Sequence, residues 1–351
     1  MINVVDKNII PGEELIRRES RQAELRASLT PAQLELIYEN QWFHLLVPQR
    51  LGGKEMALPA FARLMERLAF VDGSFAWNVN LGAGANMFSG FMEREEAARI
   101  FADRKACVAG SGARTGTARA FNGGFIIEGE WKYASGSAHA TYFSLNAEMV
   151  GSEGQTYRSF LVPASQVEVS DTWKVFGMRA TSSRNFRVDS VWVPASYCFD
   201  LQKPSPNFSS ALYRFPFMLL AEINMLVMAT GLASRFADLV QEALEEKGRW
   251  TARASALVEG SLADFSASRI RVYDLLDRIW VSVEQGQEIG GQGKEFRAAV
   301  LECAAASRRL VDQLYPYAGM KVLFEETDIS RVFRDFKVAS QHALLSPEGP
   351  V

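Results

Sequence analysis

The sequence predicts an α+β fold in which helices come first, a compact sheet follows and a helical bundle ends the chain. Apolar residues recur at helical spacing near both ends, whereas the middle third alternates and is broken by glycine and serine. The 351 residues also exceed the size of about 250–300 residues at which a single core stops growing, so we expect two or three packed units. We place these units at residues 1–103, 104–203 and 204–351.

Helix signals dominate the first hundred residues. Thr30 suits a helix cap, Pro31 suits the first helical position, and Gln33 completes a capping-box pattern. A second helix is predicted by an apolar stripe that ends near Asp72-Gly73. The members of this stripe follow the i, i+3, i+4, i+7 spacing and are Phe61, Leu64, Met65 and Leu68.

Extended structure is predicted from about Cys107 to Phe199. Asn122 followed by two glycines is a hairpin signal. The run Gly110–Gly116 is typical of a connecting loop, whose backbone N–H groups could approach an anionic ligand. The strand candidates are Phe125–Trp131, Tyr142–Val150, Arg158–Pro163 and Phe186–Pro194.

Long helical patterns return after Pro204–Pro206. One stripe predicts a helix that ends near Gly248, and a second stripe lies between residues 272 and 283. Two further helices are expected at about Glu295–Tyr315 and Asp328–His342. Four long helices favour an antiparallel bundle. The two stripes are Leu232, Phe236, Leu239, Val240, Ala243 and Leu244, and then Val272, Leu275, Leu276, Ile279, Trp280 and Val283.

Charge and cysteine content exclude several classes of protein. With 38 basic and 41 acidic residues the net charge is −3, so we expect no nucleic-acid partner. The three cysteines, Cys107, Cys198 and Cys303, form neither a disulfide framework nor a CxxC metal motif, which fits a reducing compartment. Met1–Ser20 lacks the continuous apolar stretch of an export signal. We therefore expect a cytoplasmic location.

One segment has the apolarity of a membrane span. Phe215–Ala233 is apolar for nearly its whole length, but it contains Glu222 and Asn224. A charge in mid-membrane costs at least about 2.5–3.5 kcal/mol. We therefore predict a helix buried inside the protein and no membrane association.

Few residues of the sequence are candidates for metal binding, proton transfer or cofactor binding. The spacing of His44, His139 and His342 gives no metal site, and His139 is typical of a surface or a turn. His342 follows a charged helix face, and a histidine in a cleft there could move protons because its ordinary pKa is near 6.5. Trp131–Gly136 predicts either a surface for a flat heteroaromatic cofactor or a core tryptophan followed by a turn.

Taken in order, a series of short motifs resembles the acyl-CoA dehydrogenase superfamily from about Leu45 to Ala343. The resemblance implies an N-terminal helical domain, a central β-barrel-like domain and a C-terminal four-helix bundle. It also implies a flavin bound between sheet and bundle, in a homotetramer or homodimer. The motifs are Leu46–Pro48 with Gly52–Gly53, Asp72–Trp77, Gly124–Phe125, Gly129–Trp131 with Ser135–Gly136, Gly177–Thr181, Val191–Pro194 and Arg334–Asp335.

The same resemblance implies the cofactor site. The family's usual Arg-x-x-Phe-Gly motif, which contributes to cofactor binding by a partner subunit, is replaced here by Lys247-Gly248-Arg249-Trp250. The binding site for the adenosine half of FAD is therefore less defined than the site for the flavin ring, and both FAD and FMN remain candidate cofactors. The residues expected to contact the flavin are Ser111, Thr115, Trp131, Ser135, Gly136 and Arg179.

One departure from the family separates two branches. Aligned on Arg334-Asp335, the glutamate base of many straight-chain acyl-CoA dehydrogenases falls at Ala343, which cannot take a proton. The neighbouring His342 is similar to the histidine of the flavin-dependent monooxygenases of this fold, and it would be the acid/base group. Glu222 is a rival base, since burial would raise its pKa. The alternative is that Glu222 forms an ion pair with an arginine in the bundle.

Three functions follow from these alternatives. The leading hypothesis is a monooxygenase that takes reduced flavin from a separate flavin reductase and hydroxylates a small aromatic or otherwise apolar substrate. The second is an acyl-CoA dehydrogenase that oxidises an acyl thioester with FAD and passes electrons to an electron-transfer flavoprotein. The third is a catalytically degenerate member that only binds flavin.

Overall fold

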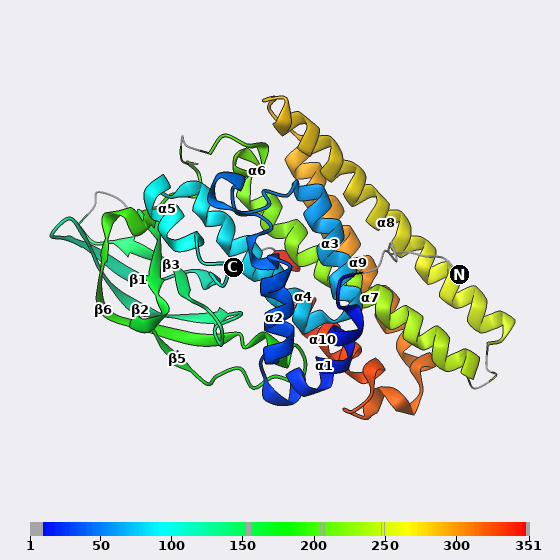
Figure 1. Cartoon of the computed structure of the whole chain (residues 1–351). Helices are drawn as coiled ribbons and strands as arrows, with labels where there is room; N and C mark the ends of the chain where they lie inside the picture. Colours follow the sequence, from blue (N-terminus) through cyan, green and yellow to red (C-terminus); the bar gives the residue numbers. More distant parts are fainter. Residues whose placement is uncertain are drawn as a thin grey trace.

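The computed structural model describes residues 10–151, 156–203, 205, 208–246, 248 and 250–348. Its order of helices, then strands, then helices confirms the α+β prediction. Figure 1 shows the sheet on one side of the molecule and the long helices on the other, and α4 contacts both β1 and α7. The division into domains at residues 103 and 203 remains a prediction.

In the described part of the chain, five α-helices precede the sheet, and several of their ends follow from local capping. The capping box at Thr30 is confirmed, because its hydroxyl accepts the N–H of Gln33 and the Gln33 side chain accepts the N–H of Thr30. Asp72 ends α3 and caps α4 by accepting the N–H of Phe75 at 2.7 Å. The helices are α1 (Glu13–Arg26), α2 (Pro31–Glu39), α3 (Leu58–Val71), α4 (Gly73–Asn86) and α5 (Arg94–Phe101).

The seven described strands form one sheet in the order β5-β6-β2-β1-β3-β4-β7. Only β1 and β3 pair in parallel among them; the other neighbours are antiparallel. The predicted hairpin joins β1 to β2, with positive φ at Asn122 and Gly123. The strands are β1 (Val108–Phe121), β2 (Gly124–Ala134), β3 (Tyr142–Met149), β4 (Tyr157–Pro163), β5 (Glu168–Ser170), β6 (Arg184–Pro194) and β7 (Cys198–Phe199).

The expectation of a loop at Gly110–Gly116 is wrong, because this run lies inside β1. The pairing of β1 with β3 shifts register between Gly110 and Arg114 and again before Gly116. Such irregularities bend a strand while keeping it in the sheet. The small residues therefore form a bulged strand beside β3.

Helix α7 (Phe217–Glu246) packs against α3, α9 and α10, and α8 packs on the outer side against α9 and α3. By length and composition α7 could cross a membrane, but 78% of its most apolar stretch is buried inside the molecule, as predicted for a core helix. Helix α10 ends at Ala339, so His342 lies beyond the helix and not at its last turn as expected. The other helices are α6 (Ala211–Arg214), α8 (Ala252–Glu284), α9 (Gln292–Ala318) and α10 (Asp328–Ala339).

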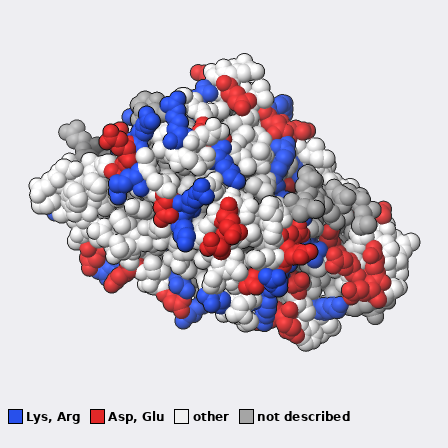
Figure 2. Space-filling model, viewed as in Figure 1, with Lys and Arg blue, Asp and Glu red and all other residues white. Residues whose placement is uncertain are grey.

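Charges are distributed over the surface without one dominant sign. On the face shown in Figure 2, basic and acidic residues are interspersed and no continuous basic area covers the molecule. Within the described ranges, no group of three or more His, Cys, Asp or Glu side chains is placed to hold a metal ion.

Candidate active site

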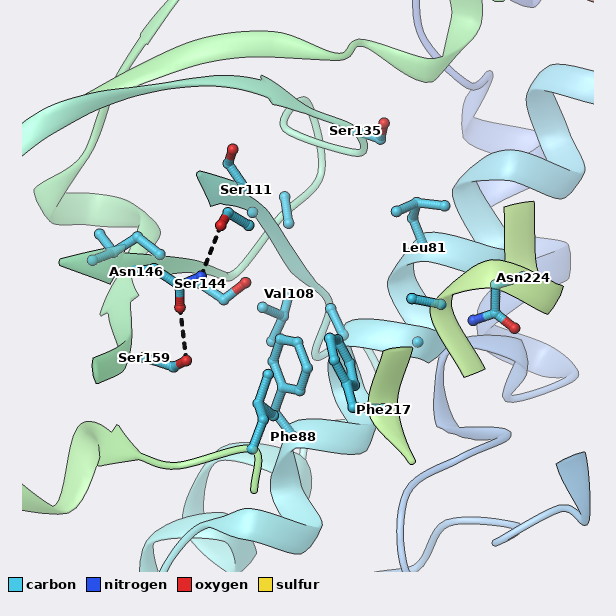
Figure 3. Close-up of a pocket in the computed structure, with 18 of the residues that line it drawn as sticks. Leu81, Phe88, Val108, Ser111, Ser135, Ser144, Asn146, Ser159, Phe217 and Asn224 are labelled. Atoms are coloured by element: carbon cyan, nitrogen blue, oxygen red, sulfur yellow. Dashed lines mark hydrogen bonds between the residues drawn. The ribbon is translucent and has the colours of Figure 1, made fainter. Parts of the chain in front are cut away.

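A cavity of about 190 Å³ lies where the sheet meets the helices. Strands β1, β3 and β4 form one wall, and helices α4 and α7 form the other (Figure 3). This is the crevice between sheet and bundle in which the sequence predicted a flavin.

Polar side chains gather on the sheet wall. Asn146 donates from Nδ2 to the carbonyl of Gly112 at 2.9 Å, and Ser159 donates from Oγ to Oδ1 of Asn146 at 2.7 Å. Ser111 and Ser144 lie on the same wall. Figure 3 shows these side chains on the strands, across the cavity from Leu81 and Asn224. The sheet wall thus offers hydroxyl and backbone groups to the polar edge of a ligand.

Ser135 lies at the edge of the cavity, at one end of a chain of hydrogen bonds. Trp77 donates from Nε1 to Ser135 Oγ at 2.9 Å, and Ser135 Oγ lies 2.7 Å from Ser183 Oγ. Ser183 Oγ in turn lies 2.7 Å from Thr181 Oγ1, which donates to the carbonyl of Met178 at 2.8 Å.

The last bond of this chain fixes the direction of the others. Because the Thr181 proton goes to the Met178 carbonyl, the Ser183 proton must go to Thr181, and the Ser135 proton must go to Ser183. Ser135 then keeps one accepting lone pair, and its side chain lines the cavity. A ligand N–H at this corner would therefore find a hydrogen-bond acceptor.

The helix wall is apolar apart from two asparagines. Leu81 and Phe88 from the α4 side and Phe217 from α7 supply apolar surface. Asn80 donates from Nδ2 to the backbone carbonyl of Asn224 at 2.8 Å, which links α4 to α7. Both asparagines line the cavity and are buried.

Three of the six predicted cofactor residues lie at or next to the cavity. Ser111 and Ser135 line it. Gly136 follows Ser135 with φ +82° and donates its N–H to the carbonyl of Thr181 at 2.8 Å, so it holds the turn in place. Thr115 is exposed, and its hydroxyl donates to the carbonyl of Glu130 at 2.6 Å, away from the cavity.

We expected Trp131 and Arg179 to contact the flavin, but neither side chain lines the cavity. Trp131 is fully buried under the sheet, stacked on Phe186, because its side chain leaves β2 on the core face. Trp131 is instead a core tryptophan followed by a turn, which is the alternative that the sequence left open. Arg179 bonds to the carbonyl of Val175 at 3.0 Å and lies 3.6 Å from Glu325.

His342 is close to the site but does not line the cavity. Its ring lies 6.1 Å from that of Trp77, and its Nδ1 accepts the N–H of Leu344 at 3.3 Å. The neutral ring therefore carries its proton on Nε2. Burial lowers the pKa of His342, so the ring is mainly neutral near pH 7.

Glu222 is buried and bonded to Arg297 of α9. Burial raises the pKa of Glu222, although the Arg297 guanidinium opposes that effect. The side chain does not line the cavity, so the rival prediction of a catalytic base does not agree with its position. Glu222 is instead paired with an arginine in the bundle, which is the alternative that the sequence left open. The predicted cofactor motif at Lys247 and Arg249 lies outside the described residues.

Sequence reasoning did not single out Asn80 or Ser183, and it named Thr181 only as the last residue of a family motif. Asn80 gave one available signal, since it is one of several polar residues in a segment that is mostly small and apolar. The roles of Thr181 and Ser183 depend on contacts with the turn after β2, which is distant in sequence.

The comparisons with known proteins agree on one family. Residues 224–347 match the family described as acyl-CoA dehydrogenase, C-terminal domain. The indole-3-acetate monooxygenase of Pseudomonas putida is 26% identical over 320 residues, which cover 86% of this chain and 80% of that protein. The flavin-dependent monooxygenase oxygenase subunit HsaA of Mycobacterium tuberculosis is 24% identical over 368 residues, which cover 97% of this chain and 91% of that protein.

Solved structures confirm the predicted fold. The HsaA monooxygenase from M. tuberculosis superposes with a TM-score of 0.91 at 22% identity, over 96% of this chain and 92% of that one. XiaF from Streptomyces sp., in complex with FADH2 and glycerol, has a TM-score of 0.86 at 20% identity, over 96% and 90%. TdsC from Paenibacillus sp., with FMN and indole, has a TM-score of 0.79 at 18% identity, over 94% and 91%.

Proposed function

This chain belongs to the acyl-CoA dehydrogenase superfamily, and we propose that it is the oxygenase component of a two-component flavin-dependent monooxygenase. The observation that carries the proposal is the chemistry of the cavity wall. None of the described residues that line the cavity is Asp, Glu, His, Lys or Arg. An acyl-CoA dehydrogenase needs a base there to remove a substrate proton, whereas hydroxylation of an electron-rich ring needs no such C–H base before oxygen transfer.

The residues of the site fit a flavin ring. The sheet wall offers the Ser111 hydroxyl and the backbone of Gly110–Gly112, and Ser135 presents an accepting lone pair. A reduced flavin has N–H groups that match such an acceptor, and when bound it supplies two electrons for the reaction with O2. The names of the relatives and the two flavin complexes support FAD or FMN as the cofactor.

The reaction places one atom of O2 on the substrate as a hydroxyl group and releases the other as water. The two electrons come from the reduced flavin, which a separate flavin reductase supplies. The apolar side chains Leu81, Phe88 and Phe217 keep water from the reacting centre, which protects the activated oxygen from loss as peroxide. His342 is the proposed acid/base group, because its ring adjoins Trp77 and Trp77 bonds to Ser135.

We further propose that the protein acts in the cytoplasm as a homotetramer or homodimer. Large apolar side chains stay exposed beside the bundle, among them Met320, Leu323 and Phe324, with 65%, 58% and 51% of their surface accessible. Apolar groups gathered in this way are typical of contact surfaces between subunits.

Binding and oxidation of reduced flavin test the proposed function. The protein is titrated with reduced FMN and reduced FAD without oxygen, and is then mixed rapidly with O2 or with an acyl-CoA. We expect tight binding of reduced flavin and a transient absorbance band, distinct from oxidised flavin, after mixing with O2. Rapid reduction of the oxidised flavoprotein by an acyl-CoA, with no transient band, would contradict the proposal.

A further inference from the structure

The side chain of Asn224 has no hydrogen-bond partner within the described part of the chain. It lines the cavity and is only 5% exposed, and its Oδ1 is buried without a partner. Figure 3 shows the side chain coming from α7 with its amide nitrogen on the side of the cavity. Asn80 bonds to the backbone carbonyl of Asn224 and leaves the Asn224 side chain without a bond in the described residues.

A buried carboxamide without partners destabilises the protein unless something else binds it. The Asn224 amide offers one acceptor and two donated N–H bonds. Because its nitrogen is on the side of the cavity, the oxygen of a ligand hydroxyl group matches it as an acceptor. The Oδ1 of Asn80 is also buried without a partner among the described residues.

The surroundings of Asn224 restrict the rest of the ligand. Leu81, Phe88, Phe217, Leu220 and Met225 supply flat and aliphatic surface to the same cavity. No charged side chain lies among the described residues of the wall, so an ionised ligand group would lose water without gaining an opposite charge. A small neutral aromatic molecule fits these walls.

We propose that the side-chain nitrogen of Asn224 donates a hydrogen bond to the hydroxyl oxygen of a small neutral aromatic substrate whose ring packs on the apolar helix wall. This inference rests on the proposed monooxygenase function, and it adds the residue that binds the substrate hydroxyl group and the requirement for a neutral substrate. Asn80 is a positioning residue, because its bond to the Asn224 carbonyl fixes the distance between α4 and α7 at this point.

The experiment compares matched ligands in the protein loaded with reduced flavin under anaerobic conditions. Phenol and toluene have nearly the same shape, but only phenol has a hydroxyl group. By calorimetric titration we expect phenol to bind about tenfold more tightly than toluene, since one hydrogen bond to a buried amide has that order of effect. In Asn224→Leu the two ligands should bind equally. If this variant keeps the preference for phenol, the assignment of Asn224 is wrong.

The second comparison tests the charge of the substrate. 4-Methylphenol and 4-hydroxyphenylacetate differ by a carboxylate, and we expect the neutral molecule to bind more tightly. Tighter binding of 4-hydroxyphenylacetate than of 4-methylphenol would overturn the proposal that the substrate is neutral. Met228→Leu is the matched control, because Met228 is a buried residue of the same helix that does not line the cavity, and this variant should keep the preference for phenol over toluene.

A smaller change guards against loss of folding in Asn224→Leu. A Cβ added at Gly84 would lie 3.4 Å from Asn224 Nδ2 and within 4 Å of no other group outside its own helix turn. Gly84→Ala should therefore place a methyl beside the amide, weaken phenol binding several-fold and leave the melting temperature unchanged or higher, since alanine favours helix. Unchanged phenol binding would contradict the proposal. Reduced flavin is titrated first in every variant, so failure of the flavin to bind is a separate result that counts against the proposed function.

Discussion

The indole N–H of Trp77 donates a hydrogen bond to the hydroxyl of Ser135 over 2.9 Å, and this bond joins α4 to the turn after β2. The same hydroxyl is 2.7 Å from Ser183, just before β6. Three segments that are far apart in the sequence thus determine how one side chain at the cavity edge is oriented. The hydroxyl proton points to Ser183, and a lone pair remains for a ligand.

Ser183→Ala should weaken the binding of reduced flavin. Without Ser183 the Ser135 proton loses its acceptor and can rotate toward the cavity, where it no longer offers a lone pair to a ligand N–H. We expect about fivefold weaker binding, the effect of one hydrogen bond. Anaerobic titration with reduced FMN measures it. Ser137→Ala is the control, because Ser137 is a buried serine of the same turn that donates to the carbonyl of Ser182 at 2.6 Å and has no bond to Ser135. Equal losses in both variants would count against the directed chain.

His342→Asn should lower the rate of hydroxylation with little change in stability. Asparagine can still accept the N–H of Leu344, which the Nδ1 of His342 accepts now, so the short helix η8 (Ala343–Leu345) keeps its cap. It cannot exchange a proton near neutral pH. We expect the rate to fall by about 100-fold or more and the acidic limb of the pH–rate profile to disappear. A profile that matches the wild type would remove His342 from the mechanism.

Glu222→Gln should leave the reaction unchanged and reduce stability. Glu222 lies outside the cavity and bonds to Arg297 between α7 and α9. Loss of its charge should lower the free energy of unfolding by about 1–3 kcal/mol, the cost of weakening a buried charged hydrogen bond. Denaturant unfolding and turnover are measured on the same preparation. A large fall in turnover with intact folding would restore the acyl-CoA dehydrogenase alternative.

His139 makes stability depend on pH. It lies in the turn after β2, stacked on Phe43, with a buried Nε2 that has no partner among the described residues. Burial lowers the pKa of His139 from 6.5 to about 4. Between these two values the unfolded chain binds a proton that the folded chain does not, so the free energy of unfolding decreases as the pH falls from 6.5 toward 4.

His139→Phe should reduce this acid sensitivity. The phenyl ring can keep the stacking on Phe43 and has no group to protonate. Between pH 7 and pH 5 the variant should lose about 2 kcal/mol less stability than the wild type. Urea unfolding at the two pH values measures the difference. His44 and His342 remain in both proteins, so their contributions cancel. Equal losses would show that His139 does not titrate as described.

Local signals explain which parts of the fold were predictable. The capping box at Thr30 and the stripe that starts at Phe61 depend on neighbours within one or two helical turns, and both elements formed where expected. Helix α4 showed no stripe, because it is buried on nearly all sides and has no polar face. It carries Trp77 and Asn80, so an important part of the site was invisible to periodicity.

The site was predictable only in part, for reasons that lie in tertiary contacts. Ser135 belongs to a family motif and Ser111 was implied by the family resemblance, and both line the cavity. Gly110–Gly116 has the composition of a loop, yet pairing with β3 holds it as a strand. Trp131 belongs to a family motif, but the motif does not show on which face of β2 its ring lies, and the ring is buried in the core.

Oxygen isotope labelling tests the monooxygenase function most directly. The protein is supplied with reduced flavin, a small neutral phenol and O2 enriched in oxygen-18, and the product is analysed by mass spectrometry. We expect one oxygen-18 atom in each new hydroxyl group. Formation of hydrogen peroxide at the same rate with and without the phenol, and no labelled product from any neutral aromatic compound, would contradict the account.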